Sequence, residues 1–282
     1  MRTLVHISDT HILPDAAARL QGVDTLQTLE TVLEYVVSSG IKPDALVVSG
    51  DLANHGELDS YRRLRPLLER YASTLSAQLV VCMGNHDARG PFREGMLDEA
   101  QNDAPIEYVR MVGGLRIIVL DSTVPGAAYG EVRTTQLQWL QSELATPATE
   151  GTLLVLHHPP VPDNTPLAGL LTLHGAFELA STIRGTDVIG ILAGHAHHAI
   201  ATSFGGVLCY AAPATAYTVD PLLLERRTLR GVEGSGLGLI RVIDKQVVSL
   251  TISMPSDGRQ TYFHELDDQL LGRLVGESAV PA

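Results

Sequence analysis

Seven side chains that can bind metal ions occur in short polar segments along the chain, and each segment follows an apolar run. Carboxylate, imidazole and amide groups suit divalent metals with catalytic roles, whereas structural zinc sites favour paired thiolates. Seven ligands are too many for one ion and are suited to two. The candidate ligands are Asp9, His11, Asp51, Asn85, His157, His195 and His197.

Two divalent ions at one site would suit phosphoryl chemistry. Ions about 3.5 to 4 Å apart can activate a shared hydroxide and stabilise the attacking and the leaving oxygen at phosphorus. Asp51 is the candidate bridge between them. With Asp9 and Asp51 ionised and the histidines neutral, two such ions leave a local charge of about +2. This charge can hold a small phosphodiester although the chain carries a formal net charge of −12.

The segment Gly84-Asn85-His86-Asp87 follows the apolar run 79–83 and combines four useful groups. A glycine lets the backbone and a ligand come close, and an amide oxygen can ligate a metal. An imidazole can bind an anion or transfer a proton, and a carboxylate can orient that imidazole.

Each segment alone also has an ordinary structural interpretation, such as a turn or a helix cap. Of His157 and His158, only one can face a site, because neighbours in extended backbone point oppositely, and His157 directly ends a strand. The same reasoning places His195 and His197 on one side and His198 on the other. Five segments in this order, each ending an apolar run, favour one shared site. Four histidines match no motif and are expected to be structural or surface residues: His6, His55, His174 and His264.

The elements that must position these segments alternate in the first third of the chain. Apolar runs predict strands over residues 4–8, 45–48 and 79–83, and helical spacing predicts helices over 24–39 and 57–72. Pro66 should kink the second helix or mark a late start. Right-handed crossovers between parallel strands would bring the polar segments to the carboxyl ends of the strands.

The second half of the chain is predicted to be richer in strands. A hairpin turns at Gly113-Gly114, and the helical segment 134–144 carries the only tryptophan. Together with the first half, this pattern fits two packed sheets with helices outside. Further strands are expected at residues 153–156, 188–192, 199–204, 206–211, 237–243 and 246–252, the last four antiparallel.

The 282 residues, of which 45% are hydrophobic, can bury a large core. We expect a single domain over residues 1–275 and a flexible tail at 276–282, with mobile glycines at 235–238. The long loops 158–175 and 212–236 are expected to form a substrate rim and a dimer contact.

Composition excludes several classes of function. The net negative charge and the 5% aromatic content argue against a nucleic-acid polymer as partner. No apolar run approaches the ~18 residues of a transmembrane segment, and the N-terminus does not resemble a signal peptide. Cys82 and Cys209 lie in apolar runs, and buried free thiols are favoured over a disulfide. We therefore expect a cytoplasmic protein.

The ordered motifs resemble those of the calcineurin-like metallophosphoesterase superfamily, and within it the bacterial class III cyclic nucleotide phosphodiesterases, including mycobacterial enzymes. The similarity covers residues 9 to 197. It lies in Asp9-x-His11, Gly50-Asp51-x-x-Asn54, Gly84-Asn85-His86-Asp87, His157 and Gly194-His195-x-His197, and in the stretches 43–52, 114–121 and 156–160.

The resemblance implies an α/β fold, a four-layer α-β-β-α sandwich of two mixed sheets. It implies a catalytic role for His86, which would contact the substrate phosphate beside Asn85 and help to protonate the leaving oxygen, with Asp87 or a backbone carbonyl holding its ring. It also implies two divalent or mixed-valence ions of iron, manganese or zinc, and a homodimer. One ion would lie at Asp9, His11, Asp51 and His197, and the other at Asp51, Asn85, His157 and His195.

The run Asp51-Leu52-Ala53-Asn54-His55-Gly56 lacks the arginine with which related protein phosphatases grip a monoester. Small diesters are therefore favoured. The first expectation is hydrolysis of 3′,5′-cyclic AMP by a metal-bridging hydroxide, with other cyclic nucleotides, including 2′,3′-cyclic ones, as further substrates. The alternatives are a glycerophosphodiesterase or a broad small-diester enzyme of the same fold, and, less favoured, a non-enzymatic scaffold.

Overall fold

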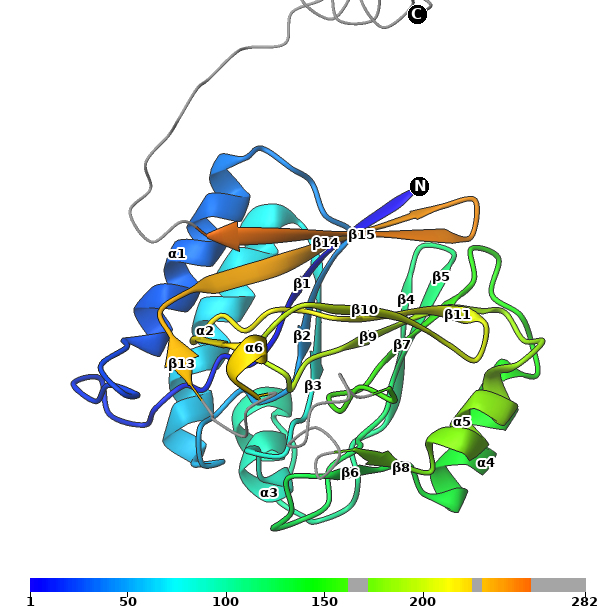
Figure 1. The fold of residues 1–282 in the computed structure, drawn as a ribbon, viewed down its shortest axis with the longest axis horizontal. Coiled ribbons are helices and arrows are strands. Elements are labelled where there is room, and N and C mark those ends of the chain that lie inside the picture. The colour runs from blue at the N-terminus through cyan, green and yellow to red at the C-terminus, as the bar shows by residue number, and fades with distance from the viewer. Residues whose placement is uncertain (162–171, 225–229, 255–282) are drawn as a thin grey trace, which may run out of the picture.

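The computed structural model describes residues 1–161, 172–224 and 230–254. The expected tail, the middle of the first long loop and His264 lie outside these residues. Two sheets pack face to face within the described part of the chain. Figure 1 shows α1 and α2 on one side of the strands and α4 and α5 on the other.

The first sheet joins the two ends of the described chain. Its order is β15-β14-β1-β2-β3, with β1, β2 and β3 parallel and β14 antiparallel to β1. The sequence patterns predicted these strands but not that the last two complete the sheet begun by the first. The strands are β1 (Arg2–Ile7), β2 (Ala45–Ser49), β3 (Gln78–Cys82), β14 (Ser235–Ile243) and β15 (Gln246–Met254).

The expected mobility of residues 235–238 is wrong, because these residues begin β14 and pair with β15. A Cβ atom on Gly238 would lie 2.6 Å from the ring of Tyr210, and one on Gly236 would lie 2.7 Å from the carbonyl oxygen of Ile252. The glycines therefore allow close packing inside the sheet.

The second sheet has the order β10-β11-β9-β7-β5-β4. The hairpin predicted around Gly113-Gly114 is confirmed as antiparallel β4 and β5. β11 is antiparallel to β10, as expected, but it is also parallel to β9. The strands are β4 (Tyr108–Val112), β5 (Leu115–Val119), β7 (Thr152–Val155), β9 (Val188–Ala193), β10 (Ile200–Phe204) and β11 (Val207–Ala211).

The helices begin close to where the sequence predicted them. Asp24 caps α1 by accepting the backbone N–H of Gln27. α2 runs on through Pro66, so a late start at this proline is wrong: burial of the face carrying Tyr61, Leu64 and Leu68 holds the helix across the missing hydrogen bond. The longer helices are α1 (Thr25–Ser38), α2 (Leu58–Leu75), α4 (Thr134–Leu144) and α5 (Ala176–Ile183).

Shorter elements form the loops around the ends of the strands. The expected dimer loop 212–236 contains two short strands and one helical turn among its described residues. These elements are α3 (Arg89–Phe92) with a π-helical turn (Arg93–Leu97), α6 (Pro221–Leu224), β6 (Gly130–Glu131), β8 (Leu173–His174), β12 (Thr218–Val219) and β13 (Gly231–Val232).

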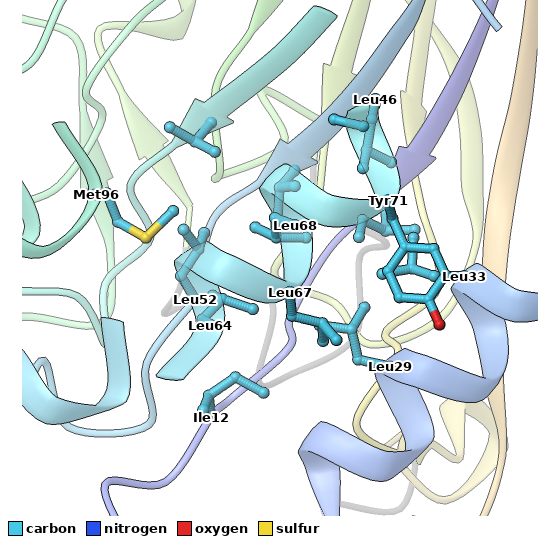
Figure 2. Packing of buried hydrophobic residues seen from close by; sticks show 14 of the residues in the cluster. Ile12, Leu29, Leu33, Leu46, Leu52, Leu64, Leu67, Leu68, Tyr71 and Met96 are labelled. Atoms are coloured by element: carbon cyan, nitrogen blue, oxygen red, sulfur yellow. The ribbon is translucent and has the colours of Figure 1, made fainter. Parts of the chain in front are cut away.

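Three clusters of buried hydrophobic residues lie between four layers of helices and strands. Leu33 of α1 and Tyr71 of α2 belong to the cluster between these helices and the first sheet, shown in Figure 2. A second cluster lies between the sheets, and a third between the second sheet and α4 and α5. The four-layer α-β-β-α sandwich is thereby confirmed.

The side chain of Tyr108 links the two sheets by hydrogen bonds. Tyr108, the first residue of β4, donates its hydroxyl proton to the carbonyl oxygen of Val81 in β3 at 2.7 Å. The same hydroxyl accepts the backbone N–H of Val81 at 3.0 Å. The outermost strands of the two sheets are therefore joined at this point.

Both cysteines are buried free thiols, as the sequence predicted. In residues 1–161, 172–224 and 230–254, the structure contains no helix with the length and apolar character needed to span a membrane.

Candidate dinuclear metal centre

The polar segments meet because each one follows the carboxyl end of a strand at the same end of the two sheets. Asp9 and His11 follow β1, and Asp51 follows β2. Asn85 and His86 follow β3, His157 follows β7, and His195 and His197 follow β9. All seven predicted ligands thus lie on loops that leave parallel strands.

Four of them form the first ligand group: Asp9, His11, Asp51 and His197 offer ligand atoms that all lie within 4.8 Å of one another, and all four residues are buried. The Nε2 atom of His11 lies 3.6 Å from Asp51 Oδ2, and that of His197 lies 3.5 Å from Asp9 Oδ1. Two carboxylates and two imidazoles therefore converge on one point.

Asp51, His157 and His195 form the second ligand group, with the same 4.8 Å limit between ligand atoms. His157 Nε2 lies 3.3 Å from Asp51 Oδ2. Asp51 belongs to both groups, as expected of a bridge. Asn85 follows Gly84, whose backbone passes so close to Asp51 that a Cβ atom there would overlap its carboxylate.

The donors of the second group are suited to a divalent cation. Asn85 Oδ1, His157 Nε2 and His195 Nε2 are buried, and none has a hydrogen-bond partner among the described residues. Unpaired buried polar atoms are costly, and an ion bound by these oxygen and nitrogen donors would satisfy them. The residues present therefore fit the metal site that the motifs predict.

The charges at the site are strongly coupled. Burial alone would raise the pKa of Asp51, but the charge of His157, whose Nε2 lies 3.3 Å from Asp51 Oδ2, outweighs it and holds that pKa well below its usual range. Burial opposes protonation of His157, yet Asp51 raises the pKa of His157 to about 9. A cation bound between them would displace this proton, since only the neutral imidazole ligates.

Burial lowers the pKa of His11 and of His195 to about 3. Both imidazoles are therefore neutral near pH 7, the state that metal binding requires.

The backbone at the ligands is unusual. Asp9, His11 and Asp51 have φ angles of 52°, 44° and 52°, and His195 and His197 have 74° and 60°. The expectation that the last two share one side of an extended segment is therefore wrong. Left-handed turns, which cost about 1 to 2 kcal/mol per residue, direct His195 to the second group and His197 to the first.

Oxygen atoms hold three of the ligand imidazoles from behind. The Nδ1 atoms of His11, His157 and His197 pair with Asn54 Oδ1 at 3.1 Å, the Ser49 carbonyl at 2.8 Å and the Tyr217 carbonyl at 3.0 Å. Such contacts fix the orientation of a ligand ring. Asn54 is part of a motif noted in the sequence, whereas backbone carbonyls leave no sequence signal.

His86 lies at the open side of the centre, with its side chain 41% exposed. Its Nδ1–H donates to the carbonyl of Asn54 at 2.7 Å, and its backbone N–H donates to Asp51 Oδ1 at 2.8 Å. The Nε2 atom lies 4.0 Å from Asp51 Oδ2. Of the two supports expected for this ring, the structure shows the backbone carbonyl.

Asp87 holds the neighbouring loops and makes no hydrogen bond to the ring of His86. Its carboxylate accepts the backbone N–H groups of Leu52, Ala53 and Gly84 and the hydroxyl of Tyr61. It thereby fixes the segments that carry Asp51 and Asn85. Its predicted catalytic role would be indirect.

We expect Tyr61→Phe to lower the free energy of unfolding by about 1 to 3 kcal/mol, because the buried Asp87 carboxylate loses a hydrogen-bond donor. Urea denaturation measures this change. Tyr35→Phe is the control, since Tyr35 is 46% exposed on α1. Equal unfolding midpoints for the two variants would contradict the role assigned to the Tyr61–Asp87 contact.

Asn54→Ala should weaken binding at the first ligand group about 10- to 100-fold, because the ring of His11 loses its partner. The carbonyl that holds His86 remains in this variant. Calorimetric titration with Mn²⁺ measures the effect. His55→Ala is the control: it removes the neighbour of Asn54 Nδ2 and leaves Oδ1 in place, so an equal loss of affinity there would exclude the proposed support.

The remaining described histidines lie away from the ligand groups or behind them. His6 is buried and pairs with the hydroxyl of Ser49 at 2.8 Å, so its predicted structural role is confirmed. His55 is exposed, and His174 is exposed and stacks on Tyr129. His158 is buried behind the second group, and burial holds its pKa well below the usual range.

Comparison with known proteins identifies a family. Residues 2–199 match the calcineurin-like phosphoesterase family. A cAMP/cGMP dual specificity phosphodiesterase of Mycobacterium tuberculosis is 44% identical over 278 residues, covering 98% of this chain and 86% of that protein. The 3′,5′-cyclic adenosine monophosphate phosphodiesterase CpdA of Pseudomonas aeruginosa is 32% identical over 255 residues, covering 86% and 90%.

Among solved structures, a dimetal phosphatase from Danio rerio superposes with a TM-score of 0.60 at 13% identity, covering 89% of this chain and 99% of that one. At this identity the likeness concerns the fold alone.

Proposed function

The chain belongs to the calcineurin-like phosphoesterase family, and we propose that it is a dinuclear phosphodiesterase that hydrolyses 3′,5′-cyclic AMP to AMP. The observation that carries the proposal is the pair of ligand groups sharing Asp51, with the exposed His86 beside them. The relatives named as cyclic nucleotide phosphodiesterases support the substrate class.

Asp9, His11, Asp51 and His197 would hold one ion, and Asp51, Asn85, His157 and His195 the other. Two such ions supply Lewis acidity that activates water and offsets the charge developing at phosphorus. Iron, manganese and zinc all suit these oxygen and nitrogen donors.

His86 would bind the phosphate and transfer a proton. Because its Nδ1–H is directed to Asn54, Nε2 is the nitrogen available to the substrate. As the oxygen of water forms a new bond to phosphorus and the water releases a proton to solvent, the bond from phosphorus to O3′ breaks. A protonated Nε2 would donate its proton to that leaving oxygen. Asn85 would also contact the substrate phosphate.

The substrate is proposed to be a small diester. Arg89 follows Ala88 and donates hydrogen bonds to Asp121 at 2.8 Å and to Thr123. Its guanidinium therefore already has partners within the protein. A diester carries less negative charge than a monoester and needs no such guanidinium. Cyclic GMP and 2′,3′-cyclic nucleotides are proposed as further substrates.

A turnover panel with defined Mn²⁺ loading tests the function. It compares 3′,5′-cyclic AMP, cyclic GMP, 2′,3′-cyclic AMP, a glycerophosphodiester and AMP. The proposal predicts hydrolysis of the cyclic diesters and little release of phosphate from AMP. Preference for the glycerophosphodiester would favour the alternative enzyme, and no turnover with two ions bound would favour a scaffold.

We also propose a cytoplasmic homodimer. The two buried free thiols support a reducing compartment. Light scattering after gel filtration tests the oligomeric state, and fractionation of cells tests the location.

A further inference from the structure

His158 lies against the second ligand group but has no part in the mechanism above. It is fully buried, and its ring centroid lies 4.7 Å from that of His195 and 5.1 Å from that of His157. Its Nδ1 pairs with the hydroxyl of Ser122 at 2.8 Å. Its Nε2 is buried and has no hydrogen-bond partner within the described ranges. An apolar side chain would avoid the cost of that unpaired nitrogen.

The second observation concerns His195. The other three ligand imidazoles each have an Nδ1 held by an oxygen atom, as described above. The Nε2 atom of His195 is buried and has no hydrogen-bond partner among the described residues. The rings of His157 and His158 lie beside it instead. Of these two rings, that of His158 lies closer to His195, so packing against His158 can fix the orientation of the His195 ring.

The position of His158 is fixed from two sides. Ser122 pairs with its ring and also accepts its backbone N–H at 3.4 Å. Gly130 passes so close to the ring that a Cβ atom there would overlap it. The ring of His158 is therefore held in a fixed position beside the ring of His195.

We propose that His158 is a positioning residue that holds His195 in the orientation in which it presents a ring nitrogen to the second ion. This inference rests on the proposed function only in taking the second ligand group as a metal site. It assigns His158 no contact with the substrate.

Three variants test the proposal in different ways. His158→Asn keeps a polar atom near Ser122 but loses the far part of the ring. Ser122→Ala removes the contact that fixes the ring, and Gly130→Ala displaces the ring without changing its chemistry. His174→Asn is the control, because His174 is exposed and stacks on Tyr129.

In each of the three variants, titration with Mn²⁺ should show one ion bound as in the wild type and the second ion bound about 10- to 100-fold more weakly. The electron paramagnetic resonance spectrum should change from a coupled pair of ions to a single ion at limiting Mn²⁺. Saturating Mn²⁺ should restore kcat, with KM unchanged. A fold defect alone would not be reversed in this way.

Binding of both ions with wild-type affinity in all three variants would overturn the proposal. A raised KM with unchanged metal affinity would also overturn it, since His158 would then contact the substrate. The metal titration requires no turnover. A wild-type protein that binds two ions but leaves cyclic nucleotides intact would refute the proposed function and leave this inference standing.

Discussion

Asp51→Asn is expected to lower turnover of cyclic AMP by about 10³-fold or more, because one carboxylate serves both ligand groups. The substitution keeps the shape of the side chain and removes its charge, so both ions lose the shared negative charge at once. Elemental analysis after loading with Mn²⁺ should find fewer than two ions per chain.

Asp187→Asn is a matched control for Asp51→Asn. Asp187 is also a carboxylate with little exposure, but it pairs with Arg116 at 2.9 Å and belongs to neither ligand group. This control weakens the ion pair with Arg116 but should keep both ions once folded. Full metal content and turnover in Asp51→Asn would rule out Asp51 as the bridge.

His86→Ala should keep both ions and lose about 10²- to 10⁴-fold in kcat, the range expected when a general acid is removed. Neither ligand group contains His86. Asn85→Ala, one residue away, should instead weaken binding of the second ion. Metal titration and steady-state kinetics on the same preparations separate the two effects.

His55→Ala is the control for loss of an exposed histidine near His86. It should keep kcat within a small factor, since its ring pairs only with Asn54 Nδ2 among the contacts described. Loss of metal from His86→Ala, or retention of its activity, would contradict the role proposed for His86.

Local patterns in the sequence were sufficient for most elements and for the carboxylates and imidazoles that the structure brings together in the two ligand groups. Asp24 and the spacing of Leu29, Val32 and Leu33 define α1, because a cap and an apolar face are properties of neighbouring residues. The motifs ending β1 and β2, and those ending β7 and β9, converge within each sheet because parallel strands share the end at which their loops emerge.

The sequence could not show features that depend on distant contacts or on backbone torsion. Residues 235–238 are ordered by pairing with β15 and by the ring of Tyr210, which lies outside their own segment. Alternation of side chains presupposes extended backbone, so it could not anticipate the positive φ angles of His195 and His197.

Supports made by the main chain are also hidden from sequence patterns. The carbonyls of Ser49 and Tyr217 hold two ligand rings, and any residue could supply them. The pairing of Asp87 with Tyr61 joins a loop to α2 across 26 residues. The family resemblance left either Asp87 or a backbone carbonyl as the support of the His86 ring, and the structure shows the carbonyl of Asn54.

The Tyr108–Val81 link has a consequence for association between chains. β3 ends the first sheet, so the outward peptide groups of Val81 lie along an open edge. Such edges can template pairing with a strand of another chain and lead to aggregation. The Tyr108 hydroxyl already satisfies both the N–H and the carbonyl of Val81. A foreign strand would have to break both bonds first, so β3 is protected against intermolecular pairing at Val81.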